Sequence, residues 1–320
     1  MIDVVALGEL LIDFATVSTD GDGYPTMAAH PGGAPANFLA ALTKYGRSTA
    51  LLGKVGDDTF GRLLVQTLDR AGIGTRGLRM DSRFFTTLAF VTFDDHGDRA
   101  FAFSRKPGAD TCIAFEELEL SLLDEAGGFH FGTLSLTHEP ARTATVRAVE
   151  YAKSRGKLIT YDPNQRKPLW EDLDECRKQL LWGLMQADVV KISDEEVQFL
   201  FGLDAEAGAQ YILDHFGVKL VFVTCGAEGC FYKNAAASGW VPALKGLKVI
   251  DTTGAGDIFG GAALSRILSA MEEGKQPGEL GAPELREIVR FACAAAGLST
   301  TRPGGISSVP EYEEVLAVMG

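Results

Sequence analysis

The sequence predicts an α/β fold, in which a doubly wound, mostly parallel sheet is flanked by helices and accompanied by a small second β-sheet. Short apolar runs rich in β-branched and aromatic residues alternate with segments of helical periodicity, a pattern typical of parallel sheets with helices on both faces. Two other segments alternate polar and apolar residues, which indicates hairpins with one solvated face. The 320 residues contain no repeat and no linker-like stretch, so we expect one domain over residues 1–320.

Five apolar runs are the expected buried strands. In chain order they are DVVALGE (3–9), FHFGTL (129–134), KLITYD (157–162), DVVKIS (188–193) and KLVFVTC (219–225). We interpret the whole N-terminal stretch MIDVVALGELLIDF as the first strand, with Asp13 at its end. Ligands of such sheets bind beyond the carboxyl ends of the strands. Function is therefore expected at IDF, YDPN, KISDEE and TCGAEG.

Helical spacing of apolar residues predicts the segments between these strands. The expected helices cover APANFLAALTKYG (34–46), residues 139–155, residues 172–187, EVQFLFG (196–202) and residues 258–271. The hairpin segments are residues 14–31 and 84–106, the second folded around the turn DDHGD (94–98). We expect these two segments to form a small sheet that projects from the main body as a lid.

Composition excludes several classes of protein. The net charge is −13, so a non-specific grip on nucleic acid or on anionic lipid is not expected. The N-terminal apolar run is interrupted by Glu9 and Asp13, so it is neither a signal peptide nor a membrane span. Five cysteines without a Cys-x-x-Cys pair indicate buried, reduced thiols of a cytosolic protein rather than metal ligands.

Two nucleotide-binding motifs are absent or out of place. No Gly-Lys pair is followed by Ser or Thr, so the chain has no Walker A loop. The glycines at 72, 74 and 77 match G-x-G-x-x-G, but they follow the amphipathic stretch FGRLLVQTLDRA instead of a strand. A helix C-cap and a turn explain these glycines better than a dinucleotide site.

The stretch DTTGAGDIFGGA (251–262) carries the strongest chemical signal. With a helix expected from residue 258, Thr253 to Gly256 present backbone N–H groups at its positive end, which is an anion site. Asp257 falls in the first turn and can accept a proton. Gly260 and Gly261 indicate close approach of another group to this helix end. Taken alone, the same pattern also fits a capped helix behind a glycine turn.

Seven stretches in a characteristic order now identify a family resemblance. They are GELLIDF, PGGAPANFLAALTKYG with GKVGDDTFG, FSRKPGAD, YDPNQRKPLW, VKISDEE, VTCGAEG and DTTGAGDIFGGA. Over its full length the chain resembles the ribokinase-like (PfkB) sugar kinases, and among them most of all the fructokinases. The resemblance implies a ribokinase-like fold and transfer of the γ-phosphate of ATP to the 6-hydroxyl of fructose with Mg²⁺, and the reduced cysteines indicate a cytoplasmic location.

The resemblance also assigns the catalytic residues. Asp257 would take the proton of the attacking hydroxyl, and Gly254, Ala255 and Gly256 would form the anion hole beside it. Phosphoryl transfer needs positioning and charge stabilisation, which preorganised N–H donors supply. We expect a carboxylate at a helix N-terminus to stay ionised, so that it accepts the proton late in the reaction.

Sugar recognition is assigned in the same way. The resemblance places Asp13, Gly32, Gly33, Asn37, Arg105 and Arg166 around the sugar. A carboxylate and a carboxamide suit vicinal hydroxyls, although without the resemblance Asp13 and Asn37 also fit a structural carboxylate and a helix cap. Exposed arginines are usually solvated surface. They would equally suit a sugar acid, so 2-keto-3-deoxygluconate kinase is the alternative, followed by ribokinase and nucleoside kinase. A catalytically silent sugar sensor is the candidate from another class.

The remaining assignments concern the nucleotide, the ions and the assembly. Thr224, Gly226 and Gly229 match the nucleotide loop of the family, Lys191 would face a phosphate, and Glu196 would orient the water shell of Mg²⁺. Cys293 stands where many relatives have Asn near the adenine, which predicts looser selection of ATP over GTP. A site for a monovalent cation, K⁺, would be formed by Asp251, Thr253, Ser299, Arg302, Gly304 and Ser308. Related enzymes pair through the lid, so a homodimer is expected.

Overall fold

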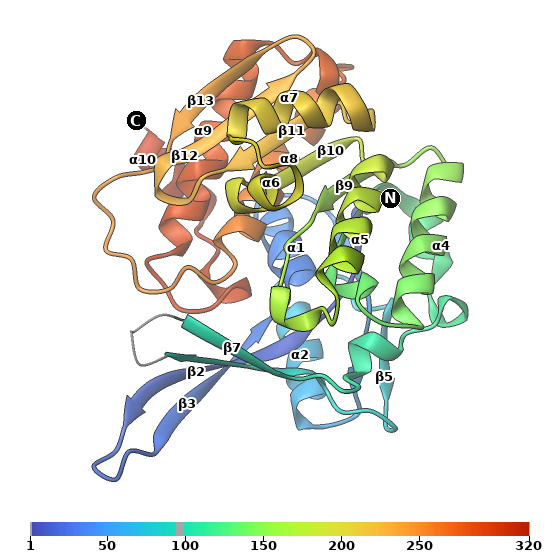
Figure 1. Ribbon diagram of the computed structural model, residues 1–320, viewed down its shortest axis with the longest axis vertical. Coiled ribbons are helices and arrows are strands. Elements are labelled where there is room, and N and C mark those ends of the chain that lie inside the picture. Colours follow the sequence, from blue (N-terminus) through green and yellow to red (C-terminus); the bar gives the residue numbers. More distant parts are fainter. Residues whose placement is uncertain (1, 94–98, 320) are drawn as a thin grey trace.

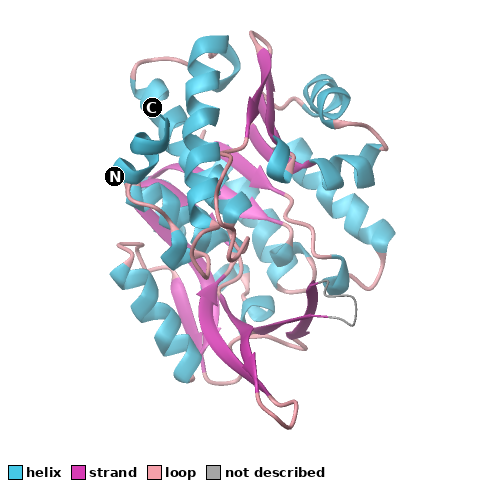
Figure 2. Ribbon diagram, turned by 90° about the vertical axis from the view of Figure 1, so that its left-hand side faces the viewer, coloured by secondary structure: helices cyan, strands magenta, loops and turns pink. Residues whose placement is uncertain are grey.

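The computed structural model describes residues 2–93 and 99–319 and has the predicted α/β architecture. A large sheet forms the centre of the molecule, with helices on both faces (Figures 1 and 2). In spatial order its nine strands are β13 (Ser238–Pro242), β12 (Gly229–Asn234), β11 (Leu220–Thr224), β10 (Val189–Ser193), β9 (Leu158–Asp162), β8 (Ala126–Gly132), β1 (Ile2–Leu7), β4 (Thr49–Gly56) and β5 (Leu78–Asp81). Neighbouring strands are parallel from β11 to β5, and β12 and β13 extend the sheet in antiparallel pairing.

Two hydrophobic cores cover the two faces of this sheet. Val4 and Ala6 of β1 belong to one core, whereas Val5 and Leu7 belong to the other, because successive side chains of a strand point to opposite faces. The first core packs against α1 (Ala34–Lys44), α2 (Thr59–Arg70), α8 (Ala255–Glu272), α9 (Ala282–Ser299) and α10 (Tyr312–Met319). The second packs against α3 (Leu120–Glu125), α4 (Ala141–Ser154), α5 (Leu173–Gln186), α6 (Asp194–Phe201) and α7 (Ala205–Phe216). Across the described ranges, no helix combines the length and apolarity needed to span a bilayer.

The N-terminal run is two strands, not the single strand expected. β1 ends at Leu7, and the chain then enters β2 (Leu11–Thr19) of the small sheet, so Asp13 lies within β2. Between the two strands the chain passes close to Pro35 at Gly8. A Cβ at this position would lie 2.6 Å from the Cγ of Pro35, so glycine is required there. The run is mostly apolar because Val4 to Leu7 are buried in the large sheet, and Leu11 and Ile12 are buried in the small one.

The small sheet consists of β3 (Pro25–Gly32), β2, β6 (Leu88–Phe93) and β7 (Arg99–Ser104), in that order. The pairs β2–β3 and β6–β7 are antiparallel hairpins, as predicted, but β2 and β6 run parallel, so the sheet is mixed. The predicted turn at 94–98 lies outside the described residues. The β2–β3 hairpin projects well away from the main body (Figure 1).

The glycines at 72 and 74 have the structural role that the sequence indicates. α2 ends at Arg70, and Gly72 follows with a left-handed φ of 74°. The amide of Gly74 donates to the carbonyl of Thr49 (2.9 Å). This segment is therefore the end of a helix and a turn.

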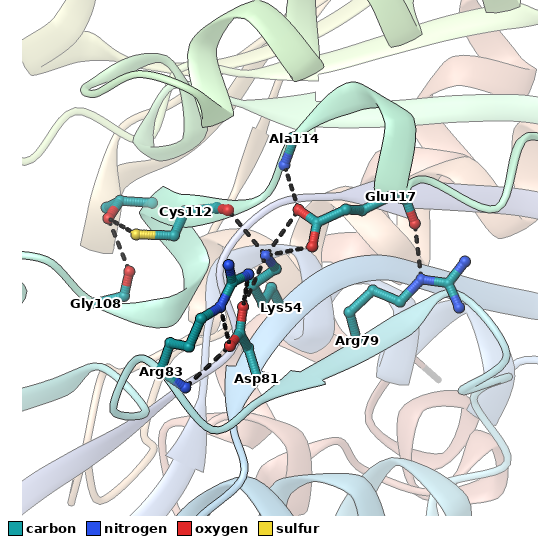
Figure 3. Close-up of polar contacts among 9 residues, drawn as sticks. Lys54, Arg79, Asp81, Arg83, Gly108, Cys112, Ala114 and Glu117 are labelled. Carbon is teal, nitrogen blue, oxygen red and sulfur yellow. Dashed lines mark hydrogen bonds and ion pairs between the residues drawn. The ribbon is translucent and has the colours of Figure 1, made fainter.

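A buried ion cluster joins β4, β5 and residues 112–117 of the main body (Figure 3). Lys54 of β4 is 1% exposed, and its Nζ donates to both carboxylate oxygens of Glu117 (2.6 and 2.7 Å), to Asp81 (3.3 Å) and to the carbonyl of Cys112 (2.9 Å). Arg83 and then Lys54 hold the pKa of Asp81 well below its usual range. The ammonium is fully occupied by these acceptors, so the cluster is structural.

Candidate active site

The N-terminus of α8 begins earlier than the sequence indicates. The helix begins at Ala255 instead of residue 258, and Gly254 is its N-cap, with a left-handed φ of 75°. Gly254, Gly256 and Asp257 line a cleft of about 690 Å³. Ala255 does not line it, and its amide donates to the carbonyl of Thr252 (3.3 Å). The amide donors expected of an anion hole are therefore those of the first helical turn, without Ala255.

Close packing of α1 against α8 explains the glycine pair at 260 and 261. A Cβ on Gly261 would come within 2.3 Å of the carbonyl oxygen of Phe38, and one on Gly260 would meet the Phe38 ring at 3.3 Å. The group expected to crowd this helix is thus α1 itself. This packing brings Asn37 of α1 beside Asp257, 220 positions away in the sequence.

Asp257 is a buried carboxylate with one fixed donor. The Nδ2 of Asn37 donates to Oδ2 of Asp257 at 2.9 Å, and Asp257 is 8% exposed. Burial raises the pKa of Asp257 against the opposing effects of Lys191, Asn37 and Arg166. This effect of burial opposes the helix N-terminus, which favours the ionised form. A raised pKa makes this carboxylate a better proton acceptor.

Asp13 faces the same cleft from β2, and two glycines make room for it. A Cβ on Gly32 would lie 2.2 Å from Oδ2 of Asp13, so Gly32 stands behind the carboxylate. Gly33, the N-cap of α1, has a φ of 122°, and a Cβ there would meet the carbonyl oxygen of Glu9 at 2.4 Å. Asp13, Gly33 and Asn37 line the cleft. Burial raises the pKa of Asp13 to about 6, against the attraction of Arg166.

The two predicted arginines have different places. Arg166 is exposed and lines the cleft. Arg105 is 3% exposed and does not line it. The guanidinium of Arg105 donates to Asp110 (2.8 Å), to the carbonyl of Leu134 (2.9 Å) and to the hydroxyl of Thr137 (2.9 Å). The expectation that Arg105 meets the sugar is corrected on this geometry, because these internal partners occupy the donors of its guanidinium. Arg105 instead supports Leu134, which forms part of the cleft wall.

The predicted nucleotide loop is divided. Thr224, at the end of β11, and Gly226 line the cleft, and the space beyond the Cα of Gly226 is open. Gly229 does not line it. With a φ of 118°, and with a Cβ that would lie 2.1 Å from the carbonyl oxygen of Val241, Gly229 is required by the turn between β11 and β12. Its predicted contact with nucleotide is replaced by this structural role.

Cys293 lies in a second hollow, of about 640 Å³. The hollow is formed by residues 241–245 and by side chains of α9 and α10. Burial raises the pKa of the Cys293 thiol to about 12. The thiol is therefore protonated at neutral pH and can offer only a weak hydrogen bond.

Glu196 and Lys191 also line the cleft. Glu196 forms a capping box with Ser193 at the start of α6, and its carboxylate accepts from the amide of Ser193 (2.9 Å). It also accepts from the amide of Gln165 (2.6 Å) in the loop after β9. Each oxygen keeps a further lone pair, so this rigid carboxylate fits the predicted role of orienting water around Mg²⁺. The Nζ of Lys191 pairs with Oδ2 of Asp162 at 3.0 Å.

The predicted cation site draws on two segments that lie side by side. Oδ1 of Asp251 accepts from the amide and hydroxyl of Thr253 (2.9 and 2.7 Å), and Oδ2 accepts from the amide of Gly304 (2.9 Å). The hydroxyls of Ser299 and Ser308 donate to the carbonyls of Ala296 and Gly305, which leaves their lone pairs for a cation. The guanidinium of Arg302 pairs with Glu314, so only its main chain is available. An oxygen-rich set of this kind fits a hard cation.

Several cleft residues were not singled out from the sequence. Among them are Glu9, Phe103, Leu134, Asn164 and Thr252. Burial raises the pKa of Glu9 to about 7, and its carboxylate accepts from the amide of Ala34 (2.9 Å). Asn164 has a φ of 45°, and Asn after a strand end is a signal for this conformation. Phe103 reaches the cleft from the small sheet, and its local sequence carries no such signal.

Comparisons with known proteins cover almost the whole chain. The family described as pfkB family carbohydrate kinase matches residues 1–312. The chain is 42% identical over 320 residues to Fructokinase-1 of Zea mays, covering 99% of this chain and 97% of that protein. The structure of a fructokinase from Xylella fastidiosa with bound ATP superimposes with a TM-score of 0.88 at 29% identity, covering 100% of this chain and 98% of that one. A Vibrio cholerae fructokinase bound to fructose, ADP and calcium superimposes with a TM-score of 0.86 at 32% identity, covering 100% and 99%.

Proposed function

The chain belongs to the pfkB family of carbohydrate kinases, and from this premise we propose that it is a fructokinase, which transfers the γ-phosphate of ATP to the 6-hydroxyl of D-fructose. Relatives about 40% identical over almost the whole chain are fructokinases. The observation that carries the proposal is that the first turn of α8, with Asp257, opens into the same cleft as Asp13.

Each group in the cleft has a defined task in this reaction. Asp257 receives the proton of the 6-hydroxyl as that oxygen attacks, and the hydrogen bond from Asn37 fixes the orientation of its carboxylate. The amides of the first turn of α8 stabilise the charge on the transferring phosphoryl group. Asp13 accepts hydrogen bonds from sugar hydroxyls, and Arg166 is free to meet sugar or phosphate oxygens.

Two ions belong to the proposal. Glu196 would hold the water shell of Mg²⁺, which neutralises phosphate charge when bound with ATP. The oxygen set around Asp251, Ser299 and Ser308 would hold K⁺ through side-chain and main-chain oxygens. The contribution of this chain is to keep those oxygens in place beside the anion-binding turn.

The small sheet is proposed to act as a lid. Asp13 of β2 and Phe103 of β7 bring it to the cleft, so closure over the sugar would exclude water. Val17 and Tyr24 on its projecting hairpin are 61% and 70% exposed, which supports pairing of two lids in a homodimer. Because the five cysteines are unpaired, we also propose a cytoplasmic location.

A 2-keto-3-deoxygluconate kinase is the second candidate. The exposed guanidinium of Arg166 beside Asn164 in the cleft would suit the carboxylate of a sugar acid. Internal pairing of Arg105 leaves one fewer arginine for that purpose.

A coupled assay of ADP release tests these alternatives. Fructose, 2-keto-3-deoxygluconate, ribose and adenosine are compared as acceptors, and phosphorus NMR of the product identifies the esterified hydroxyl. Fructose 6-phosphate as the fastest product supports the proposal. A higher kcat/KM with 2-keto-3-deoxygluconate than with fructose would favour the second candidate over a fructokinase. Sugar binding without ADP release would indicate a non-catalytic sensor.

A further inference from the structure

A buried ion pair lies directly beneath the catalytic turn. Lys191 stands on β10 and Asp162 ends β9, and these strands are parallel neighbours. The Lys191 ammonium and the Asp162 carboxylate are 3.0 Å apart, and their side chains are 12% and 8% exposed. Lys191 lies on the same face of the sheet as Val189, two residues earlier on the strand. That face packs against α8.

The ammonium of Lys191 lies close to Gly256 in the first turn of α8. A Cβ on Gly256 would lie 2.8 Å from Nζ of Lys191, so the charge lies against the first turn of α8. On its other side Lys191 borders a cavity of about 20 Å³, which it shares with His130, Thr160 and Asp162. A buried ammonium is costly unless a carboxylate or other acceptors compensate it.

The other groups that border this cavity carry no negative charge that could pair with Lys191 in place of Asp162. His130 stacks on Phe38 with ring centroids 3.7 Å apart, and Nδ1 lies 3.0 Å from the hydroxyl of Thr160. Burial lowers the pKa of His130 to about 3, so this ring is neutral at physiological pH. Burial also lowers the pKa of Lys191, but Asp162, Glu196 and Asp257 together raise it. Lys191 is therefore charged.

We propose that Asp162 is a positioning residue, whose carboxylate holds the Lys191 ammonium against the first turn of α8 and so controls the charge around Asp257. The part of this inference that concerns phosphoryl transfer rests on the proposed function. The ammonium adds positive charge to the helix N-terminus where phosphoryl charge develops. Without Asp162, the same ammonium would be drawn toward Asp257, the base itself.

The charged and titratable groups that act on Asp257 come from several elements. They are Lys191 on β10, Asp162 on β9, Glu196 on α6, Arg166 in the loop after β9, and Asp13 on β2. Of these groups, Lys191 lowers the pKa of Asp257 the most. Removal of Lys191 and removal of its partner must therefore act on Asp257 in opposite directions.

Two variants test this opposition. In Asp162→Asn a neighbouring negative charge is lost and the ammonium is free to pair with Asp257. The acidic limb of the pH profile of kcat then moves to lower pH by about one unit, and kcat at pH 8 falls about tenfold or more. In Lys191→Met the acidic limb moves to higher pH. The KM for fructose stays within about threefold in both variants, because neither side chain is assigned to the sugar.

A titration that does not require turnover separates this inference from the proposed function. Carbon NMR of the aspartate carboxyls, with the Asp257 signal assigned by its loss in Asp257→Asn, follows the pKa of Asp257 directly. Opposite shifts in the two variants support the inference even if fructose is not the substrate. Shifts in the same direction, or no shift, overturn it even if fructose is.

Controls address folding and general loss of charge. Lys219→Met removes the partner of Asp188 from an ion pair on the exposed surface (2.8 Å), and it should leave the Asp257 titration unchanged. The double variant Asp162→Asn/Lys191→Met leaves neither member of the ion pair as an unpaired buried charge and is expected to fold even if a single variant does not. The inference is supported if the acidic limb of kcat in the double variant has a midpoint pH between the midpoints of the two single variants. A limb outside that interval contradicts it.

Discussion

Replacing Asp257 by Asn is the sharpest test of the catalytic assignment. The amide is nearly isosteric, and its oxygen can still accept the hydrogen bond that Nδ2 of Asn37 now donates to Asp257 at 2.9 Å. It cannot accept a proton, however. A positioned general base contributes about 10²- to 10⁴-fold, so kcat should fall by that factor, or about 2.7–5.4 kcal/mol in activation free energy. The KM values for fructose and ATP should stay within about threefold, because the cleft keeps its shape.

Stability supplies the control for this variant. Burial raises the pKa of Asp257, so its contribution to stability is full below the unfolded value of 3.8 and is lost as the pH rises through the folded pKa. A neutral amide removes this penalty, and the melting temperature at pH 8 should be equal to or above that of the wild type. Asp204→Asn, which changes the N-cap of α7, is a matched control with unchanged kcat. The assay is ADP release coupled to NADH oxidation, and a kcat within about tenfold of the wild type would refute the assignment.

Four further predictions concern the sugar site, the ion cluster and the cation. The KM for fructose should rise as the pH falls below about 6, because the pKa of Asp13 is raised to about 6 and its protonation removes an acceptor; pH profiles of kcat/KM should lose this limb in Asp13→Asn. Gly32→Ala should raise the KM for fructose about tenfold or more and leave the KM for ATP unchanged, since the new Cβ would lie 2.2 Å from the Asp13 carboxylate; normal fructose kinetics would contradict this geometry. Lys54→Met should lower the free energy of unfolding by about 3–5 kcal/mol in urea titrations, because two carboxylates lose their buried partner; a loss below about 1 kcal/mol would show that the cluster is not structural. Replacing K⁺ by tetramethylammonium should lower kcat, and equal rates in the two ions would remove the proposed cation site.

Much of the fold was predictable because its signals are local. The strands at 158–162, 189–193 and 220–224 are short apolar runs bounded by polar residues, and burial on both faces of a parallel sheet requires such runs. The strands at 49–56 and 229–242 were not assigned, and the division of the N-terminal run after Leu7 was missed. An apolar run has the same appearance whether one sheet or two bury it.

The candidate site was predictable to a different extent. Motif order led to Asp257, Asp13, Asn37 and Arg166, which the fold brings into one cleft. Arg105 was placed on the sugar by the family resemblance of FSRKPGAD. The sequence does not show that Asp110 and Leu134 occupy its donors. Gly229 was misplaced for a similar reason. From the sequence alone, a glycine that a turn requires cannot be distinguished from one that makes room for a nucleotide.

By itself, then, the sequence determined the α/β class and the strand and helix segments with the strongest periodicity. Through the family resemblance, it also assigned the residues that we propose for phosphoryl transfer. Only the tertiary structure decided the proton affinity of Asp257, the donor that Asn37 supplies from 220 positions away and the ion pair of Lys191 with Asp162 beneath them. The physical reason is that periodicity and turn chemistry act over a few residues. Desolvation and charge pairing depend instead on which distant segments share a buried space.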